Sequence, residues 1–395
     1  MKTAYITSNG CPENQMDTAR VRTYLESNGW SIVQDPTEAD LILFNACGLL
    51  NAATNRSLSI VSELKEKAKN NSQVVVWGCL PKIDPEALAT VYSGPSFNEV
   101  ELHTLDEIIG AERSISDIVC NEVITGYQGK PSRWERIRHF LPDMLTRSYR
   151  ELDEKVNLAR EGDPSIYYIK ISTGCLDRCS YCAIRFSRGK LRSKPMEQIM
   201  TEFRSGLHRG FREFSLMGTD LGVQGMDLGY NLADLLAEMV KEEGDFKISI
   251  RNTHPYYLKN MLKEIEPVFS SGKIHFLGIP AQSGNNRILE LMGRHYTSED
   301  VKECVSTIRR ADPSVLLRTQ MMVGFPTETR RDYYDSIKLL NETRFDFAEV
   351  YIYSPRPETA AADMDGQVSK TVSKLRYLYM VMQAQFGGKL RKSCG

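Results

Sequence analysis

The first hundred residues alternate between short apolar runs and stretches in which apolar positions recur at helical spacing. The runs predict buried strands and the spaced positions predict helices. Strands are expected at residues 2–8, 40–46 and 73–78, and helices at residues 16–29 and 53–69. Because continuous apolar runs are typical of parallel strands covered on both faces, we predict a small doubly wound α/β domain over residues 1–112.

The same alternation resumes at residue 165. Strands are expected at residues 166–172, 212–217, 246–250, 274–279, 315–321 and 347–353. Helices are expected at residues 195–208, 231–242, 257–265, 285–292, 298–310 and 329–341. Six βα units in series predict a partial (β/α)6 barrel over residues 165–366, so the fold class is α/β. Residues 113–164 are predicted to form a helical linker, and residues 367–395 a C-terminal helix.

Composition limits the function classes. The chain has 395 residues with 41% hydrophobic and 26% charged, which predicts a folded core. A net charge of −1 argues against binding of nucleic acid through positive charge distributed over the whole protein. No apolar run approaches the roughly 18 residues of a membrane span, and the N-terminus lacks a secretion signal. We therefore expect a cytoplasmic protein without a membrane partner, in which nine cysteines favour metal ligation or catalysis over disulfides.

Three cysteines crowd into the segment GCLDRCSYC after the first predicted barrel strand. Cys175, Cys179 and Cys182 lie where parallel barrels build their active sites. Three thiolates suit iron or zinc, but zinc requires a fourth ligand that the loop does not offer. A four-iron cluster held by three cysteines leaves one iron open to another ligand. A zinc site with a distant fourth ligand is the alternative.

Three further cysteines share a different setting. Cys11, Cys47 and Cys79 each follow a predicted parallel strand of the first domain and lie next to glycine. Because the carboxyl ends of parallel strands meet along one edge, we expect these thiols to converge and to hold a second cluster. The alternative is three inert, buried cysteines. The remaining cysteines are Cys304, expected in the core, and Cys120 and Cys394, which have no assigned role.

The spacing C-x3-C-x2-C closely resembles that of radical S-adenosylmethionine (SAM) enzymes. Two cysteine groups, in the order small α/β domain and then barrel, resemble the radical SAM methylthiotransferases over about residues 3–360. The motifs that carry the resemblance include SNGCPENQMD, NACG, WGCLPK, GCLDRCSYC, RGKLRS, IPAQSGNNRILELMGRHYT, VGFPTET and YSPRPETAA.

The resemblance implies two iron–sulfur clusters and SAM as cofactors. The Cys175 triplet would hold the four-iron cluster that cleaves SAM, and the Cys11 group an auxiliary four- or three-iron cluster that carries sulfur. One SAM would methylate that sulfur and a second would yield the radical that activates a substrate C–H bond. A flavodoxin or ferredoxin would supply electrons. The expected SAM contacts are Tyr181, Gly218, Thr219, Asp220, Gln282, Arg318 and Phe325.

The sequence also departs from the family. We expect the C-terminal β-barrel that binds substrate in known members to be missing, and Gln320 replaces a frequent aspartate. These departures favour a peptide or protein side chain as the substrate. Methylthiolation of a tRNA base stays open, with residues 129–150 and 185–194 contacting phosphates and Trp134 or Tyr149 stacking on bases. An electron-transfer role for the auxiliary cluster, or a two-cluster scaffold without turnover, would also fit the cysteine pattern.

Overall fold

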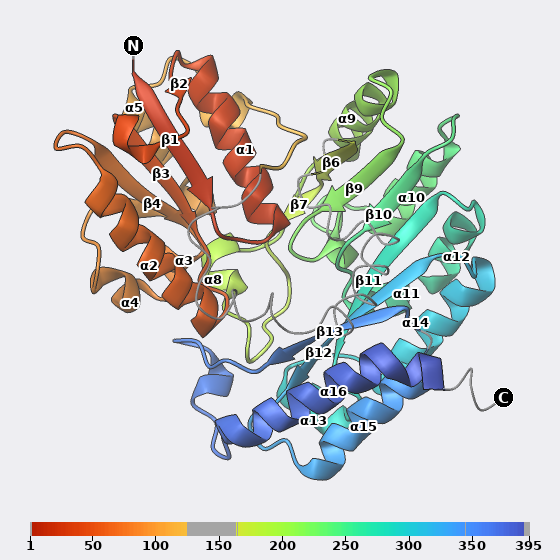
Figure 1. Ribbon diagram of the computed structural model, residues 1–395. Coiled ribbons are helices and arrows are strands. Elements are labelled where there is room, and N and C mark those ends of the chain that lie inside the picture. Colours follow the sequence, from red (N-terminus) through yellow and green to blue (C-terminus); the bar gives the residue numbers. More distant parts are fainter. Residues whose placement is uncertain (1, 125–162, 164, 344, 391–395) are drawn as a thin grey trace.

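The computed structural model describes residues 2–124, 163, 165–343 and 345–390. It contains two parallel sheets, one in each half of the chain (Figure 1). The first sheet has the strand order β2-β1-β3-β4-β5. Its strands are β1 (Thr3–Ser8), β2 (Ser31–Ile32), β3 (Leu41–Ala46), β4 (Gln73–Gly78) and β5 (Ser96–Phe97). The α-helices of this half are α1 (Pro12–Ser27), α2 (Asn51–Lys67), α3 (Leu80–Ile83), α4 (Pro85–Ala89) and α5 (Thr104–Ile109).

Strand β3 shows why this half folds as a covered sheet. All six of its residues are buried, and they alternate between two clusters. Leu41 and Leu43 pack with α1 and α5 on one face, and Ile42 and Phe44 pack with α2 on the other. The period of two is the pleat of a strand, so one apolar run supplies both cores. The doubly wound arrangement expected from the sequence is confirmed.

The second half forms a six-stranded parallel sheet in the order β13-β12-β11-β10-β9-β6. Its strands are β6 (Ile166–Lys170), β9 (Glu213–Met217), β10 (Lys247–Ile250), β11 (Ile274–Gln282), β12 (Leu316–Val323) and β13 (Phe347–Ile352). A small antiparallel pair, β7 (Ser172–Thr173) and β8 (Arg192–Ser193), follows β6. The order follows the sequence from one edge to the other, so the partial (β/α)6 barrel expected from the sequence is confirmed.

Helices cover the outside of this sheet (Figure 1). They are α9 (Met196–His208), α10 (Leu232–Lys241), α11 (Pro255–Asn260), α12 (Leu262–Ser270), α13 (Asn286–Leu291), α14 (Ser298–Ala311), α15 (Arg330–Glu342) and α16 (Lys370–Leu390). The short helix α8 (Ile184–Arg188) lies instead against α3 of the first half. Among the described residues no strand follows β13. None of the described helices combines the length and the apolarity that a membrane crossing requires.

Two helices depart from the expectation. The helix predicted at 257–265 is two helices that meet at Met261, and the first begins at Pro255, whose missing N–H suits a first helical position. Helix α1 begins at Pro12, four residues before the predicted start. The early turn was missed because its buried residues, Asn14 and Gln15, are polar.

The predicted linker at residues 113–164 lies mostly outside the described residues, so the domain boundaries stay predictions. The two halves nevertheless meet through polar contacts. Arg356, in the loop after β13, donates to Asn51, to Thr54 and to Asp84 of the first half. Lys170 of β6 donates to Asp17 at 2.6 Å.

Candidate active site

The Cys175 triplet lies in the loop between β7 and α8. Gly174 opens this loop with a φ of +80°, and a Cβ there would stand 2.2 Å from the carbonyl oxygen of Lys190. Glycine is the residue that fits both conditions. Farther along, the Ser180 hydroxyl donates to the carbonyl of Leu291 at 2.7 Å, at the end of α13. The thiols are therefore presented from a backbone that is held at several points.

The three thiols influence one another electrostatically. Burial, followed by the neighbouring Cys179, raises the pKa of Cys182 to about 11. Burial, followed by Asp220, raises the pKa of Cys175 above its ordinary value. Such thiols stay protonated at neutral pH unless a cation joins them, and a bound metal supplies that charge. Three thiols in one short loop are the donor type that iron–sulfur clusters take, so the donor chemistry fits such a group.

The second cysteine group meets at the carboxyl edge of the first sheet. Cys11 follows β1, Cys47 follows β3 and Cys79 follows β4, and these strands are direct neighbours. The Oδ1 of Asn14 accepts from the Cys11 thiol at 3.7 Å and from the Cys79 thiol at 3.8 Å. Cys11 is exposed to solvent although protein encloses it on several sides, and this enclosure raises the pKa of its thiol to about 12. Burial and then Cys79 raise the pKa of Cys47 to about 11.

Two of the expected SAM contacts form an aromatic wall beside the triplet. Tyr181 precedes Cys182 and lies edge-on to Phe325, with ring centroids 6.5 Å apart. The Tyr181 hydroxyl accepts from the Arg294 guanidinium at 2.6 Å. Phe325 is fully buried, and the loop that carries it follows β12. Sequence reasoning had not singled out Arg294, which holds the Tyr181 ring in place.

Three more expected contacts follow β9. A Cβ at Gly218 would stand 2.6 Å from the Ser172 hydroxyl, so the bare backbone is needed there. Thr219 donates to Glu13 of α1 at 3.4 Å, which links this loop to the helix that starts beside Cys11. Asp220 accepts from the backbone N–H groups of Gly222 and His254, and burial raises its pKa to about 6.

Gln282 and Arg318 lie on the neighbouring strands β11 and β12. Gln282 ends β11 in a left-handed conformation with a φ of +62°, which is strained for a residue with a side chain. Arg318 donates to the carbonyl of Arg251 and to Asn252 and pairs with Glu349 at 3.1 Å. These partners of Arg318 all lie outside the cysteine loop.

Several buried polar atoms at the carboxyl edge of the barrel have no hydrogen-bond partner among the described residues. They belong to Ser172, Asp177, Asp220, His254 and Arg294. Cys175, Asp177 and Asp220 offer ligand atoms within 4.8 Å of one another. Because unsatisfied buried polar groups are costly, this concentration indicates a place for a polar ligand. Carboxylates, a hydroxyl and a guanidinium suit the amino and carboxylate groups of SAM.

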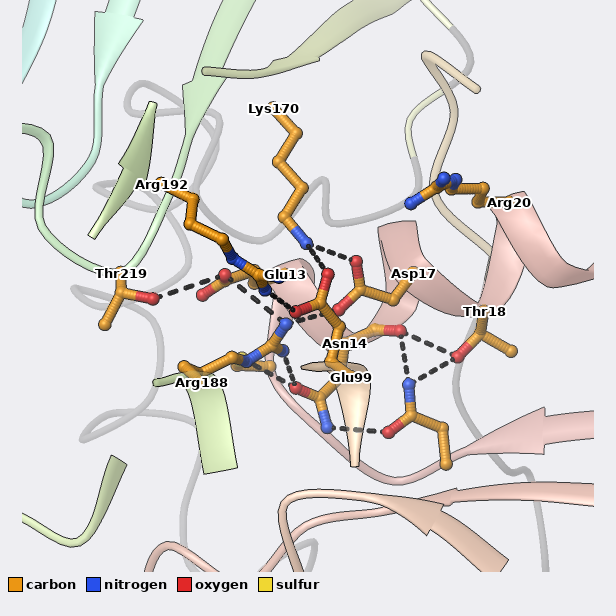
Figure 2. A network of polar contacts seen from close by, with 12 residues as sticks. Glu13, Asn14, Asp17, Thr18, Arg20, Glu99, Lys170, Arg188, Arg192 and Thr219 are labelled. Atoms are coloured by element: carbon orange, nitrogen blue, oxygen red, sulfur yellow. Dashed lines mark hydrogen bonds and ion pairs between the residues drawn. The ribbon is translucent and has the colours of Figure 1, made fainter. Parts of the chain in front are cut away.

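The basic residues of the stretch 185–194, after the triplet, are not all exposed to solvent. Arg188 is 3% exposed and ends α8 inside a polar network with Glu13, Asn14 and Asp17 (Figure 2). Arg192, by contrast, has a side chain that is 54% exposed. Sequence reasoning missed Asn14 and Asp17, because polar residues at a helix start look like surface positions until the partner half is in place.

The other cysteines and the described cavities lie elsewhere. Cys304 is buried in the core cluster of the barrel, as expected. Cys120 borders a cavity of about 340 Å³ beside Lys170 and Arg192, and a second cavity of about 280 Å³ lies near α13, α14 and α15. Neither of these two cavities is lined by a cysteine of the two groups. Cys394 lies outside the described residues.

Comparison with known proteins adds to this geometry. Residues 3–95 match the family described as "Uncharacterized protein family UPF0004", and residues 169–340 match the radical SAM superfamily. A "probable threonylcarbamoyladenosine tRNA methylthiotransferase" of Pyrococcus horikoshii is 32% identical, over 95% of this chain and 83% of the relative. This chain is a radical SAM methylthiotransferase. The ribosomal protein uS12 methylthiotransferase of Moorella thermoacetica is 29% identical, over 95% of this chain and 82% of the relative.

Membership in the radical SAM methylthiotransferases defines the cofactors. Enzymes of this class use SAM and two iron–sulfur clusters, and this chain has two groups of three cysteines. The fold agrees with that of a solved radical SAM methyltransferase, TsrM from Kitasatospora setae, with a TM-score of 0.62 and 14% identity. The alignment covers 92% of this chain and 75% of that one.

Proposed function

We propose that this enzyme methylthiolates a modified adenosine in tRNA. The support comes from the relatives, because the Pyrococcus horikoshii protein is named for threonylcarbamoyladenosine in tRNA and aligns with 95% of this chain. A relative from Bdellovibrio bacteriovorus, named for dimethylallyladenosine in tRNA, is 28% identical over 96% of the chain. The preference for a peptide drawn from the sequence has no support among these relatives. A ribosomal protein side chain is the competing target, because one relative is named for it.

The tRNA contacts expected from the sequence fall into two groups. Residues 129–150, with Trp134 and Tyr149, lie outside the described residues. In the stretch 185–194, the buried Arg188 is engaged by α1 and is not available to a phosphate. Arg192 is exposed and is therefore a candidate phosphate contact in the proposal.

The six cysteines carry the cofactors in this proposal. Cys175, Cys179 and Cys182 would hold the cluster that works on SAM, and the Cys11 group would hold the auxiliary cluster. When bound, these groups would supply the radical chemistry and the sulfur that convert a substrate C–H bond into C–SCH3. This chemistry belongs to the cofactors, and the protein contributes position and exclusion of water.

The chain's own residues orient the reactants. Tyr181 and Phe325 present an apolar wall, and the Arg294 guanidinium holds the Tyr181 hydroxyl at 2.6 Å. Asp220 keeps one oxygen on two backbone N–H groups and leaves the other free for an ammonium group. The contact of Thr219 with Glu13 joins the loop after β9 to the helix that follows Cys11. Both groups of cysteines therefore lie next to elements that contact one another. The single observation that carries the choice of tRNA is the alignment with the Pyrococcus horikoshii relative over 95% of this chain.

The test uses the full chain, loaded with iron and sulfide without oxygen and then reduced in the presence of SAM. Bulk tRNA that carries threonylcarbamoyladenosine or dimethylallyladenosine is one substrate, and ribosomal protein uS12 is the other. We expect a nucleoside that gains CH3S in place of H, detected by mass spectrometry after digestion, together with 5′-deoxyadenosine. A methylthio product on uS12, with none on tRNA, would overturn the assignment of substrate.

Cysteine variants test the two sites separately. Cys179→Ala should abolish 5′-deoxyadenosine formation, because one of the three ligands to the SAM cluster is gone. Cys47→Ala should retain 5′-deoxyadenosine formation and lose the methylthio product. Cys304→Ala is the matched control, since this thiol is buried in the core, and it should retain both activities. A methylthio product from Cys47→Ala would refute the role of the second group.

A further inference from the structure

One buried arginine of the barrel half reaches into the first half beside the second cysteine group. Arg188 ends α8, the helix that directly follows the Cys175 triplet, and only 3% of it is exposed. Its guanidinium donates to Asp17 at 2.5 Å and to the Oδ1 of Asn14 at 2.6 Å (Figure 2). A third partner, Glu13, lies at 3.5 Å. All three partners belong to α1.

Asn14 connects this guanidinium to two thiols. The same Oδ1 atom that accepts from Arg188 also lies 3.7 Å from the Cys11 sulfur and 3.8 Å from the Cys79 sulfur. The amide cannot turn freely, because its nitrogen donates to the Oδ1 of Asn45 at 2.9 Å. A single oriented amide therefore separates a fixed positive charge from two of the three thiols.

A second buried arginine approaches from another side. Arg356 is 2% exposed and donates to Asn51 at 2.5 Å, to Thr54 at 3.0 Å and to Asp84 at 2.9 Å. Asn51 begins the helix after Cys47, and Asp84 follows the short helix after Cys79. Arg356 therefore ties the helices that follow Cys47 and Cys79 to the barrel half.

The two halves carry opposite charges where they meet. In the ion pairs that cross it within the described ranges, every cation comes from the barrel half and every carboxylate from the first half. The cations are Lys170, Arg188, Arg192 and Arg356, and their carboxylate partners are Glu13, Asp17, Asp84 and Glu99. A cluster on three thiolates adds negative charge to the side that already carries the acids.

We propose that Arg188 and Arg356 are positioning residues for the auxiliary cluster, and that the buried charge of Arg188 raises the reduction potential of this cluster when the two halves are docked. The inference rests on the proposed assignment of Cys11, Cys47 and Cys79 as ligands. A fixed positive charge stabilises the more negative, reduced state of a cluster, and burial limits its screening by salt. Asp17 and Glu13 offset part of the Arg188 charge, so removal of the guanidinium leaves their negative charges beside the cluster site. The arginines thereby link the auxiliary site to the loop that holds the SAM cluster.

The test isolates the auxiliary cluster in the full chain by replacing Cys175, Cys179 and Cys182 with alanine. Iron content and the reduction potential, followed by electron paramagnetic resonance, are then measured with and without Arg188→Met. We expect a more negative potential in Arg188→Met and a potential near the original in Arg188→Lys, which keeps the charge. Arg192→Met is the matched control, because Arg192 also pairs with a carboxylate of the first half but has an exposed side chain. The reduction potential of the auxiliary cluster should not change in this variant.

The outcomes separate the two levels of the argument. If the background variant binds no iron, the assignment of the Cys11 group as ligands fails. If iron binds and Arg188→Met leaves the potential unchanged, the inference fails while the proposed function stands. Should Arg188→Met not fold, Asn14→Asp decides, because it keeps the volume and places a negative charge beside two thiols. An unchanged potential in Asn14→Asp would overturn the inference as well.

Discussion

The contribution of Asp17 to the free energy of unfolding follows from its two buried ion pairs. Its side chain is 3% exposed and lies 2.6 Å from the Lys170 ammonium and 2.5 Å from the Arg188 guanidinium. Burial raises the pKa of Asp17, but the two cations outweigh burial and lower it from 3.8 to about 2. Since one pKa unit corresponds to about 1.4 kcal/mol, the ionised carboxylate contributes about 2 kcal/mol to folding at neutral pH.

Asp17→Asn keeps the shape of the side chain and removes its charge. Lys170 retains Glu99 at 3.1 Å and Arg188 retains Glu13 at 3.5 Å, so neither cation is left alone. We therefore expect a loss of about 2–3 kcal/mol in the free energy of unfolding, at the lower end of what breaking a buried ion pair costs. Urea denaturation of the full apo chain, followed by circular dichroism, measures this loss.

The pH dependence gives an independent check. Because the folded pKa of Asp17 is depressed, its contribution is fully present above pH 3.8 and is lost as the pH falls toward 2. The difference between the original chain and Asp17→Asn should hold from neutral pH to about pH 4 and shrink below it. Asp365→Asn, an exposed carboxylate, is the control and should change nothing. A loss in Asp17→Asn that is near zero at neutral pH, or that grows on acidification, would refute the reasoning.

Two further predictions follow from close contacts. Gly174→Ala would set a Cβ 2.2 Å from the carbonyl oxygen of Lys190 at a φ of +80°. We expect iron content to fall to that of the auxiliary cluster alone and SAM cleavage to stop; full iron loading would contradict this. Arg356→Ala leaves Asp84 without its buried partner and should cost about 3 kcal/mol, seen as a lower melting temperature of the apo chain. A melting temperature equal to that of the original chain would show that Arg356 does not hold the halves together.

The sequence by itself was sufficient for the order of the elements and for the position of the cysteines directly after particular strands. Apolar runs and helical periods report burial within one element, so most predicted strands and helices agree with the structure to within a few residues. Cys11, Cys47 and Cys79 could be expected at one edge because parallel strands end on the same side of a sheet. The relatives found by sequence comparison belong to the same family that the cysteine pattern indicated.

Only the tertiary structure decided which polar residues face one another. Arg188 and Asp17 are 171 residues apart, and no local pattern distinguishes them from surface charges. The early start of α1 at Pro12 escaped notice for the same reason, since Asn14 and Gln15, the buried residues of its first turn, are polar. A hydrophobic period records that a face is covered, whereas the partner of a buried charge depends on which distant element covers it. The network that joins the two halves is therefore a property of the docked fold.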